Sequence, residues 1–119
     1  MRSFKSLTIW QEGIKIVKQS YSVLNQLPQK ETFNLKSQIA RSAVSIPSNI
    51  AEGCSRSSQI EFARFLEIAL GSAFELETQI ILLYELSYLN ERQTRLLIET
   101  IQKEQKQINS LKNKLKANG

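Results

Sequence analysis

Five polar residues recur at intervals of three and four along one segment of this 119-residue chain, and they are its best candidates for chemistry. This set, hereafter the polar stripe, consists of Gln38, Arg41, Ser45, Asn49 and Glu52. In a helix, this spacing places all five side chains on one face. An apolar row occupies another face of the same segment and consists of Leu35, Ile39, Ala43, Ile46 and Ile50. One face is therefore expected to pack, and the other to meet hydrogen-bonding partners.

The residue types give little support to catalysis. The chain has no histidine, which excludes the Glu-x-x-His pattern of di-iron bundles, histidine-dependent triads and the usual zinc sites. Arg41 and Glu52 form the best polar pair, yet no nucleophile or cofactor motif lies near them, so a structural network is favoured over an active site. No catalytic, metal-binding or cofactor-binding residue is predicted. A small enzyme that uses the Arg41/Glu52 stripe is the alternative.

Charge is unevenly distributed along the chain, and five cations near the C-terminus fall on one expected helix face. The net charge is plus five over residues 1–56, minus four over 57–89 and plus four over 90–119. The cations on this face, hereafter the basic row, are Arg92, Arg95, Lys103, Lys106 and Lys114. Such a row can bind the phosphates of RNA or DNA, although a purely solubilising face is the competing interpretation. Few aromatic residues are interleaved with it, so the sequence does not favour base stacking.

Capping residues and periodicity predict the first two helices. Thr8 and Gln11 match a capping box, and the first helix is expected to end before Pro28. The second helix should run from near Asn34 to Glu52, with Gly53 as a left-handed cap.

The remaining chain predicts two more helices. Ser58 and Glu61 match a second capping box, and the helix that follows should extend to about Ser87. Asn90 starts the last helix. Its inward seam is expected to consist of Leu97, Ile101, Ile108, Leu111 and Leu115. The expected fold is an all-α, antiparallel four-helix bundle.

The first and third helices have more apolar surface than a lone bundle needs. The main seam of helix one is predicted to consist of Leu7, Trp10, Ile14, Val17, Tyr21 and Leu24. A second row lies about 120° away and consists of Ile9, Ile16, Val23 and Leu27. Helix three has a main face of Phe62, Phe65, Leu66, Ala69, Leu76, Ile80 and Leu83 and a second set of Leu70, Phe74 and Ile81. The additional rows favour a subunit interface, with a thick core as the alternative.

Two residues inside the helices lead to specific expectations. Pro47 removes a backbone donor in mid-helix, so a kink is expected there. If helices two and three are antiparallel, Ala40 and Ala43 lie level with residues 71–73. Gly71 is then expected to permit close helix packing rather than catalysis.

Composition predicts one cytoplasmic domain over residues 1–119. Only two prolines and four glycines are present, and no linker-like segment divides the chain. Neither a signal peptide nor an apolar run long enough to span a membrane is evident, so no membrane partner is expected. The single cysteine, Cys54, is expected to lie in a loop as an incidental thiol.

A longer pattern includes the polar stripe and extends along nearly the whole chain. It consists of Phe4, Leu7, Trp10, Pro28, Glu31, Gln38, Arg41, the segment 45–53, Arg56, Glu61, Phe62, Arg64, Phe65, Ala69, the segments 71–73 and 75–77, Tyr88 and Leu89. This pattern resembles the small bacterial four-helix-bundle family associated with 23S ribosomal RNA intervening sequences. It is also similar to the accessory variability proteins of diversity-generating retroelements, pentameric bundles that bind nucleic acid and a reverse transcriptase.

These observations together favour a non-enzymatic assembly or adaptor module that binds RNA or DNA through phosphate. The resemblance implies a ring-shaped homopentamer with a nucleic-acid partner, and periodicity alone does not set the number of subunits. A scaffold that binds only other proteins is a further alternative.

Overall fold

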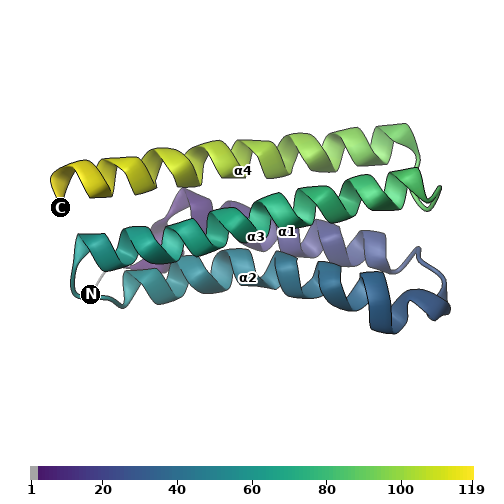
Figure 1. The fold of residues 1–119 in the computed structure, drawn as a ribbon, viewed down its shortest axis with the longest axis horizontal. Helices are drawn as coiled ribbons and strands as arrows, with labels where there is room; N and C mark the ends of the chain where they lie inside the picture. The colour runs from purple at the N-terminus through teal and green to yellow at the C-terminus, as the bar shows by residue number, and fades with distance from the viewer. Residues whose placement is uncertain (1–2) are drawn as a thin grey trace.

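The computed structural model describes residues 3–119, and these residues form helices and no strand. The four long helices are α1 (Thr8–Leu24), α2 (Ser37–Cys54), α3 (Gln59–Glu85) and α4 (Glu91–Asn118) (Figure 1). Three short elements complete the order, namely η1 (Phe4–Ser6), η2 (Gln29–Glu31) and η3 (Thr32–Lys36). The expectation of an all-helical fold with four main helices is confirmed.

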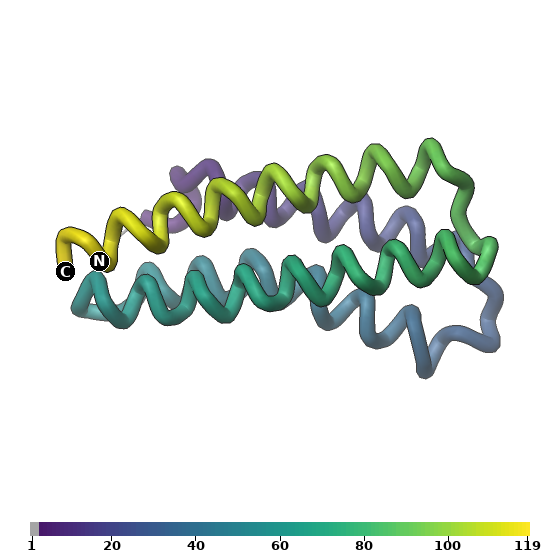
Figure 2. The backbone as a smooth tube through the Cα atoms, turned by 45° about the horizontal axis from the view of Figure 1, so that its top comes forward, coloured from purple at the N-terminus to yellow at the C-terminus, as the bar shows by residue number. Residues whose placement is uncertain are grey.

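The helices pack side by side in an elongated bundle of 45 × 23 × 20 Å. Consecutive helices run in opposite directions, so that α1 begins and α4 ends at the same end of the bundle (Figures 1 and 2). α3 packs extensively against both α2 and α4, whereas α1 packs mainly against α2 and less against α4. The seam between α1 and α4 is therefore the thinnest of the four.

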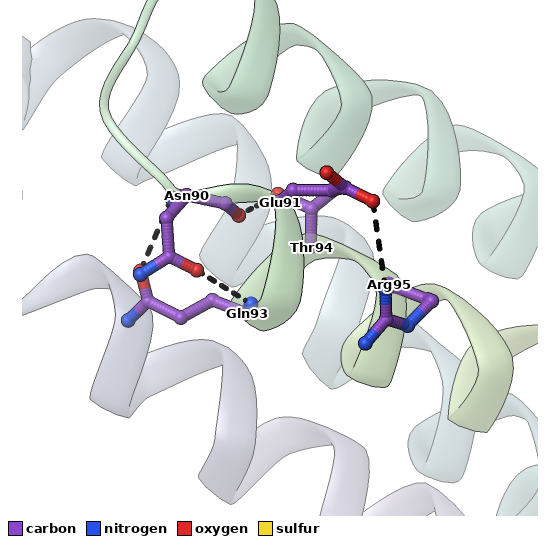
Figure 3. A network of polar contacts seen from close by, with 5 residues as sticks. All are labelled: Asn90, Glu91, Gln93, Thr94 and Arg95. Atoms are coloured by element: carbon purple, nitrogen blue, oxygen red, sulfur yellow. Dashed lines mark hydrogen bonds and ion pairs between the residues drawn. The ribbon is translucent and has the colours of Figure 1, made fainter.

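Two of the three residues predicted to cap helix starts act as expected. The Ser58 hydroxyl accepts a hydrogen bond from the Glu61 amide at 3.1 Å and so caps α3. Asn90 and Gln93 form a complete capping box at the start of α4 (Figure 3). The predicted box at Thr8 is wrong, because Leu7 occupies the cap position and no side chain caps the helix.

The core face of α1 is formed mainly by the predicted second row, while the predicted main seam is covered only in part, with Leu24 buried and Leu7, Trp10 and Val17 packed against the core. The second apolar row is buried, and Gly13 and Ser20, which lie between the two rows, are buried with it. In the row predicted to be the main seam, the side chain of Ile14 is 36% exposed and that of Tyr21 is 47% exposed. Periodicity detects both rows equally, and only the positions of α2 and α4 decide which of them is covered.

The apolar faces of α3 and α4 are confirmed. On α3, every residue of the predicted main face is buried except Phe65, which is half-buried. Its second set is largely open to solvent, with Phe74 54% exposed and Ile81 43% exposed. On α4, the predicted seam is buried apart from half-buried Leu111.

The link between α1 and α2 contains one residue with a non-helical backbone conformation. The second helix therefore starts at Ser37. Asn34 was expected near that start, but it has φ −116° and ψ −105°, outside the helical region. The Tyr88 hydroxyl donates a hydrogen bond of 2.8 Å to Glu31 and so ties this link to the turn between α3 and α4. This bond and burial raise the pKa of the Tyr88 phenol.

Two glycine predictions are wrong. Gly53 lies inside α2, and no glycine of residues 3–119 has a positive φ, so it is not a left-handed cap. Its role is steric, because a Cβ at Gly53 would lie 2.8 Å from the Phe62 ring. Gly71 was expected to permit close helix packing, yet it is exposed and a Cβ there would meet nothing within 4 Å.

Pro47 does not interrupt α2, which continues through it as a single helix. Its ring is buried against α1, where a Cβ at Gly13 would lie 3.2 Å from the Pro47 Cβ. The proline therefore serves as a packing surface at the crossing of α1 and α2.

Candidate phosphate-binding surface

The polar stripe lies along the outer junction of α2 with α3, and its middle is a hydrogen-bonded tie between the two helices. The Ser45 and Ser72 hydroxyl oxygens are 2.7 Å apart. The Asn49 amide donates to the Ser45 carbonyl at 2.8 Å and to its hydroxyl at 2.9 Å. Ser45 and Asn49 are half-buried, whereas Gln38, Arg41 and Glu52 are exposed.

The predicted network between Arg41 and Glu52 is not formed. The Glu52 carboxylate pairs with Arg56 at 3.0 Å, and the Arg56 guanidinium also lies over the Phe65 ring at 4.6 Å from its centroid. Arg41 lines a hollow of about 260 Å³ with Glu75 but forms no ion pair with any residue of the described chain. Eleven residues separate Arg41 from Glu52, about 16 Å along a helix, which is too far for contact.

The basic row lies entirely on the exposed surface of α4. The Arg95 guanidinium is 3.5 Å from the Glu91 carboxylate on the preceding turn (Figure 3). The other four cations of the row have no ion-pair partner among residues 3–119. Their charges are therefore directed to solvent and available to an anion.

Two hollows border the basic row, and both are lined in part by apolar side chains. The periodicity of the sequence did not predict that these apolar side chains lie next to the basic row. Lys103 lines a hollow of about 620 Å³ between α1 and α4, whose apolar lining includes Val23 and Leu97. Lys106 lines one of about 290 Å³ with the exposed Phe74 of α3. Phe74 and Lys106 lie together because of how far α3 and α4 are shifted relative to one another along the bundle axis.

The acidic helix α3 is held to α4 by polar contacts. Glu77 accepts hydrogen bonds from the Gln102 amide at 3.0 Å and from the Gln105 amide at 2.8 Å, as expected of a structural acid. Glu67 pairs with Lys116 at 2.6 Å, and this hydrogen bond and charge lower the pKa of Glu67. The surface ion pair between Glu67 and Lys116 therefore neutralises part of the charge difference between these helices.

Sequence reasoning missed one buried acid on α4. Glu104 is 1% exposed, and neither carboxylate oxygen has a hydrogen-bond partner in the described chain. Burial, and secondarily the charge of Glu12, raise the pKa of Glu104 to about 8. Its position was visible in the sequence, because residue 104 continues the inward spacing of Leu97, Ile101 and Ile108.

Other candidate sites are limited. No group of three or more cysteine or acidic side chains in residues 3–119 is placed to hold a metal ion. Cys54 was expected in a loop, but it is the last residue of α2 and is buried. Within the described residues, none of the helices combines the length and apolar character needed to cross a membrane.

Comparisons with known proteins agree with this architecture. The family model of the 23S rRNA-intervening sequence protein matches residues 5–110. A crystal structure of an S23 ribosomal protein family member of unknown function from Bacteroides thetaiotaomicron is similar, with a TM-score of 0.81 and 25% identity over 87% of this chain and 97% of that one. No curated protein matched. The chain therefore belongs to the 23S rRNA-intervening sequence protein family.

Proposed function

We propose that this protein is a non-enzymatic, oligomeric assembly or adaptor module of the bacterial cytoplasm that binds RNA or DNA through phosphate. The observation that supports nucleic-acid binding most directly is the basic row, which is exposed along α4 and mostly free of ion pairs within the described chain. A row of cations on a rigid helix matches a phosphate backbone without reading its bases. Sequence preference should therefore be slight.

Assembly is supported by apolar side chains that the bundle leaves exposed. Ile14 and Tyr21 on α1 and Phe74 and Ile81 on α3 are each more than a third exposed. Burying such faces against other copies removes apolar surface from water. A homopentamer is proposed on the family resemblance, and repetition of the basic row around such a ring would add avidity.

Binding should depend on the basic row and on salt. The variant Arg95→Glu/Lys103→Glu/Lys106→Glu should bind RNA, duplex DNA and single-stranded DNA many-fold more weakly, because reversed charges repel phosphate. For the wild type, affinity should fall steeply with salt, by about 0.7 to 0.9 log units per log unit of salt for each phosphate contact. Fluorescence-anisotropy titrations over a series of salt concentrations measure both effects.

A matched control separates this surface from overall charge. The variant Lys18→Glu/Lys30→Glu/Arg64→Glu reverses two lysines and one arginine that are exposed elsewhere on the chain, so its net charge changes by the same amount. It should retain most of the binding. Both variants must keep the helical content and oligomeric mass of the wild type. Equal loss in the two would show that net charge alone acts, and no binding by the wild type at low salt would favour an adaptor that binds only proteins.

The enzymatic alternative has less support from the geometry. A site that used Arg41 and Glu52 would need the two side chains to converge, whereas both are exposed and Glu52 pairs with Arg56. The polar stripe is better explained as a tie between α2 and α3 whose exposed members are available to partners.

A further inference from the structure

Glu104 is an unpaired acid inside the seam between α1 and α4. A Cβ at Gly13 of α1 would lie 3.5 Å from the Glu104 carboxylate, an ordinary contact distance, so the acid lies directly against this part of α1. Pro47 of α2 closes the same space, 3.2 Å from that Cβ position. The carboxyl thus lies where three helices meet, 1% exposed and without a donor in the described chain.

No cation compensates Glu104 from any helix that packs around it. From α1 the facing charge is Glu12, which is itself paired with Lys15 at 3.3 Å. The only charged side chains of α2, Arg41 and Glu52, are exposed. On α3, Glu77 is held by two glutamine amides of α4. On α4 itself, Lys103 is exposed.

The seam that holds Glu104 is also the thinnest of the four between neighbouring helices. α1 packs less extensively against α4 than against α2, and the hollow of about 620 Å³ lies farther along the α1–α4 seam. A helix of 17 residues such as α1 is marginal in water once its packing is lost. Separation of α1 from α4 would bring Glu104 into water and extend the hollow into an apolar cleft.

We propose that Glu104 is a proton-operated latch, which holds the α1–α4 seam closed while it is protonated and favours opening of that seam when it ionises. An ionised carboxylate cannot remain stably in this space without a partner, whereas the neutral acid can. Opening exposes the carboxylate to water and relieves its repulsion by Glu12.

The direction and range of the pH effect follow from two pKa values. The pKa of Glu104 is about 8 in the closed bundle, and an exposed glutamate has the ordinary value of 4.5. Between these values opening releases one proton, so the opening equilibrium constant rises about tenfold per pH unit. Stabilisation of the closed seam is therefore complete below pH 4.5, is lost progressively as pH rises, and is gone above about pH 8.

Residue-resolved hydrogen exchange of the full chain tests the latch. After correction for intrinsic exchange, the opening of α1 amides such as that of Ile16 should increase about 100-fold from about pH 5.5 to about pH 7.5 in the wild type. In Glu104→Gln, an uncharged variant of nearly the same shape, this dependence should disappear. Glu104→Leu removes the carboxyl by a different substitution and should also abolish it. The matched control Glu99→Gln alters an exposed acid of the same helix and should keep the wild-type dependence.

Two outcomes of the exchange experiment would reject the latch, and one would support it. If the corrected opening of α1 has the same pH dependence in the wild type and in both Glu104 variants, the latch is rejected. If α1 exchanges no faster than the buried α2–α3 amides of the wild type and follows the same pH dependence, Glu104 titrates only in global unfolding, and the latch is again rejected. Faster exchange of α1, with a pH dependence that requires Glu104, supports it.

Discussion

At the scale of single residues, glycine has a packing role in α2 and none in α3. Gly53 lies where a Cβ would be 2.8 Å from Phe62 and 2.9 Å from Phe65, whereas Gly71 has open space around it. A glycine in a helix interior costs about 1 kcal/mol relative to alanine. That cost has a packing reason at Gly53 and none within the described chain at Gly71.

Alanine substitutions should therefore shift stability in opposite directions. Gly53→Ala is expected to lower the free energy of unfolding by about 1–3 kcal/mol, because the added methyl overpacks the junction with the Phe62 and Phe65 side chains. Gly71→Ala should raise it by about 0.5–1 kcal/mol. Urea unfolding followed by circular dichroism measures both. A destabilising Gly71→Ala with an unchanged monomer fold would show instead that a partner occupies this space, and its oligomeric mass should then fall.

Glu104 also changes the charge of the molecule. The formal net charge of plus five counts this residue as an anion, but with a pKa of about 8 it is mostly uncharged at pH 7. The protein is then nearly one unit more positive than its sequence indicates. The difference lies on α4, the helix that carries the basic row.

At the scale of the elements, the starts of α1 and α4 differ in whether a side chain caps the first amides. Asn90 accepts from the Gln93 amide at 2.8 Å, and Gln93 returns a bond to the Asn90 amide at 3.3 Å. At α1 the Gln11 side chain instead donates to the Lys5 carbonyl at 2.9 Å, which fastens η1 to the helix. The same sequence signature thus marks a cap at one helix and not at the other.

Replacing Asn90 and replacing Thr8 should change the free energy of unfolding by different amounts. Asn90→Ala is expected to lower the free energy of unfolding by about 1 kcal/mol, because the first turn of α4 loses its side-chain cap. Thr8→Ala, the matched control, should change it by less than about 0.5 kcal/mol. Chemical denaturation of the two variants compares them directly. Equal losses would mean that Thr8 caps α1 in solution.

For the whole molecule, the exposed apolar groups on α1 and α3 predict self-association. Light scattering over a wide range of concentration should give a mass well above the 13.6 kDa of one chain. Ile14→Lys/Tyr21→Lys and Phe74→Lys/Ile81→Lys should each reduce that mass, because a lysine cannot be buried unpaired at an interface. Gln59→Lys/Asn113→Lys, at exposed polar positions, is the control and should leave it unchanged. A wild type that stays monomeric throughout would reject the assembly.

The sequence by itself determined the features that depend on local spacing. The helical class, the approximate bounds of the four long helices, the caps at Ser58 and Asn90 and the exposure of the basic row all follow from neighbours three or four residues apart. Periods of this kind report which residues share a face, and they do so without knowledge of other helices.

Only the tertiary structure decided which face meets which neighbour. It buried the Ile16 row of α1 fully and the Ile14 row only in part, and it left Gly71 open. It also enclosed Glu104 against Gly13 and Pro47. Each of these outcomes depends on the rotation and relative level of packed helices, which close packing of many side chains fixes together and no single helix encodes.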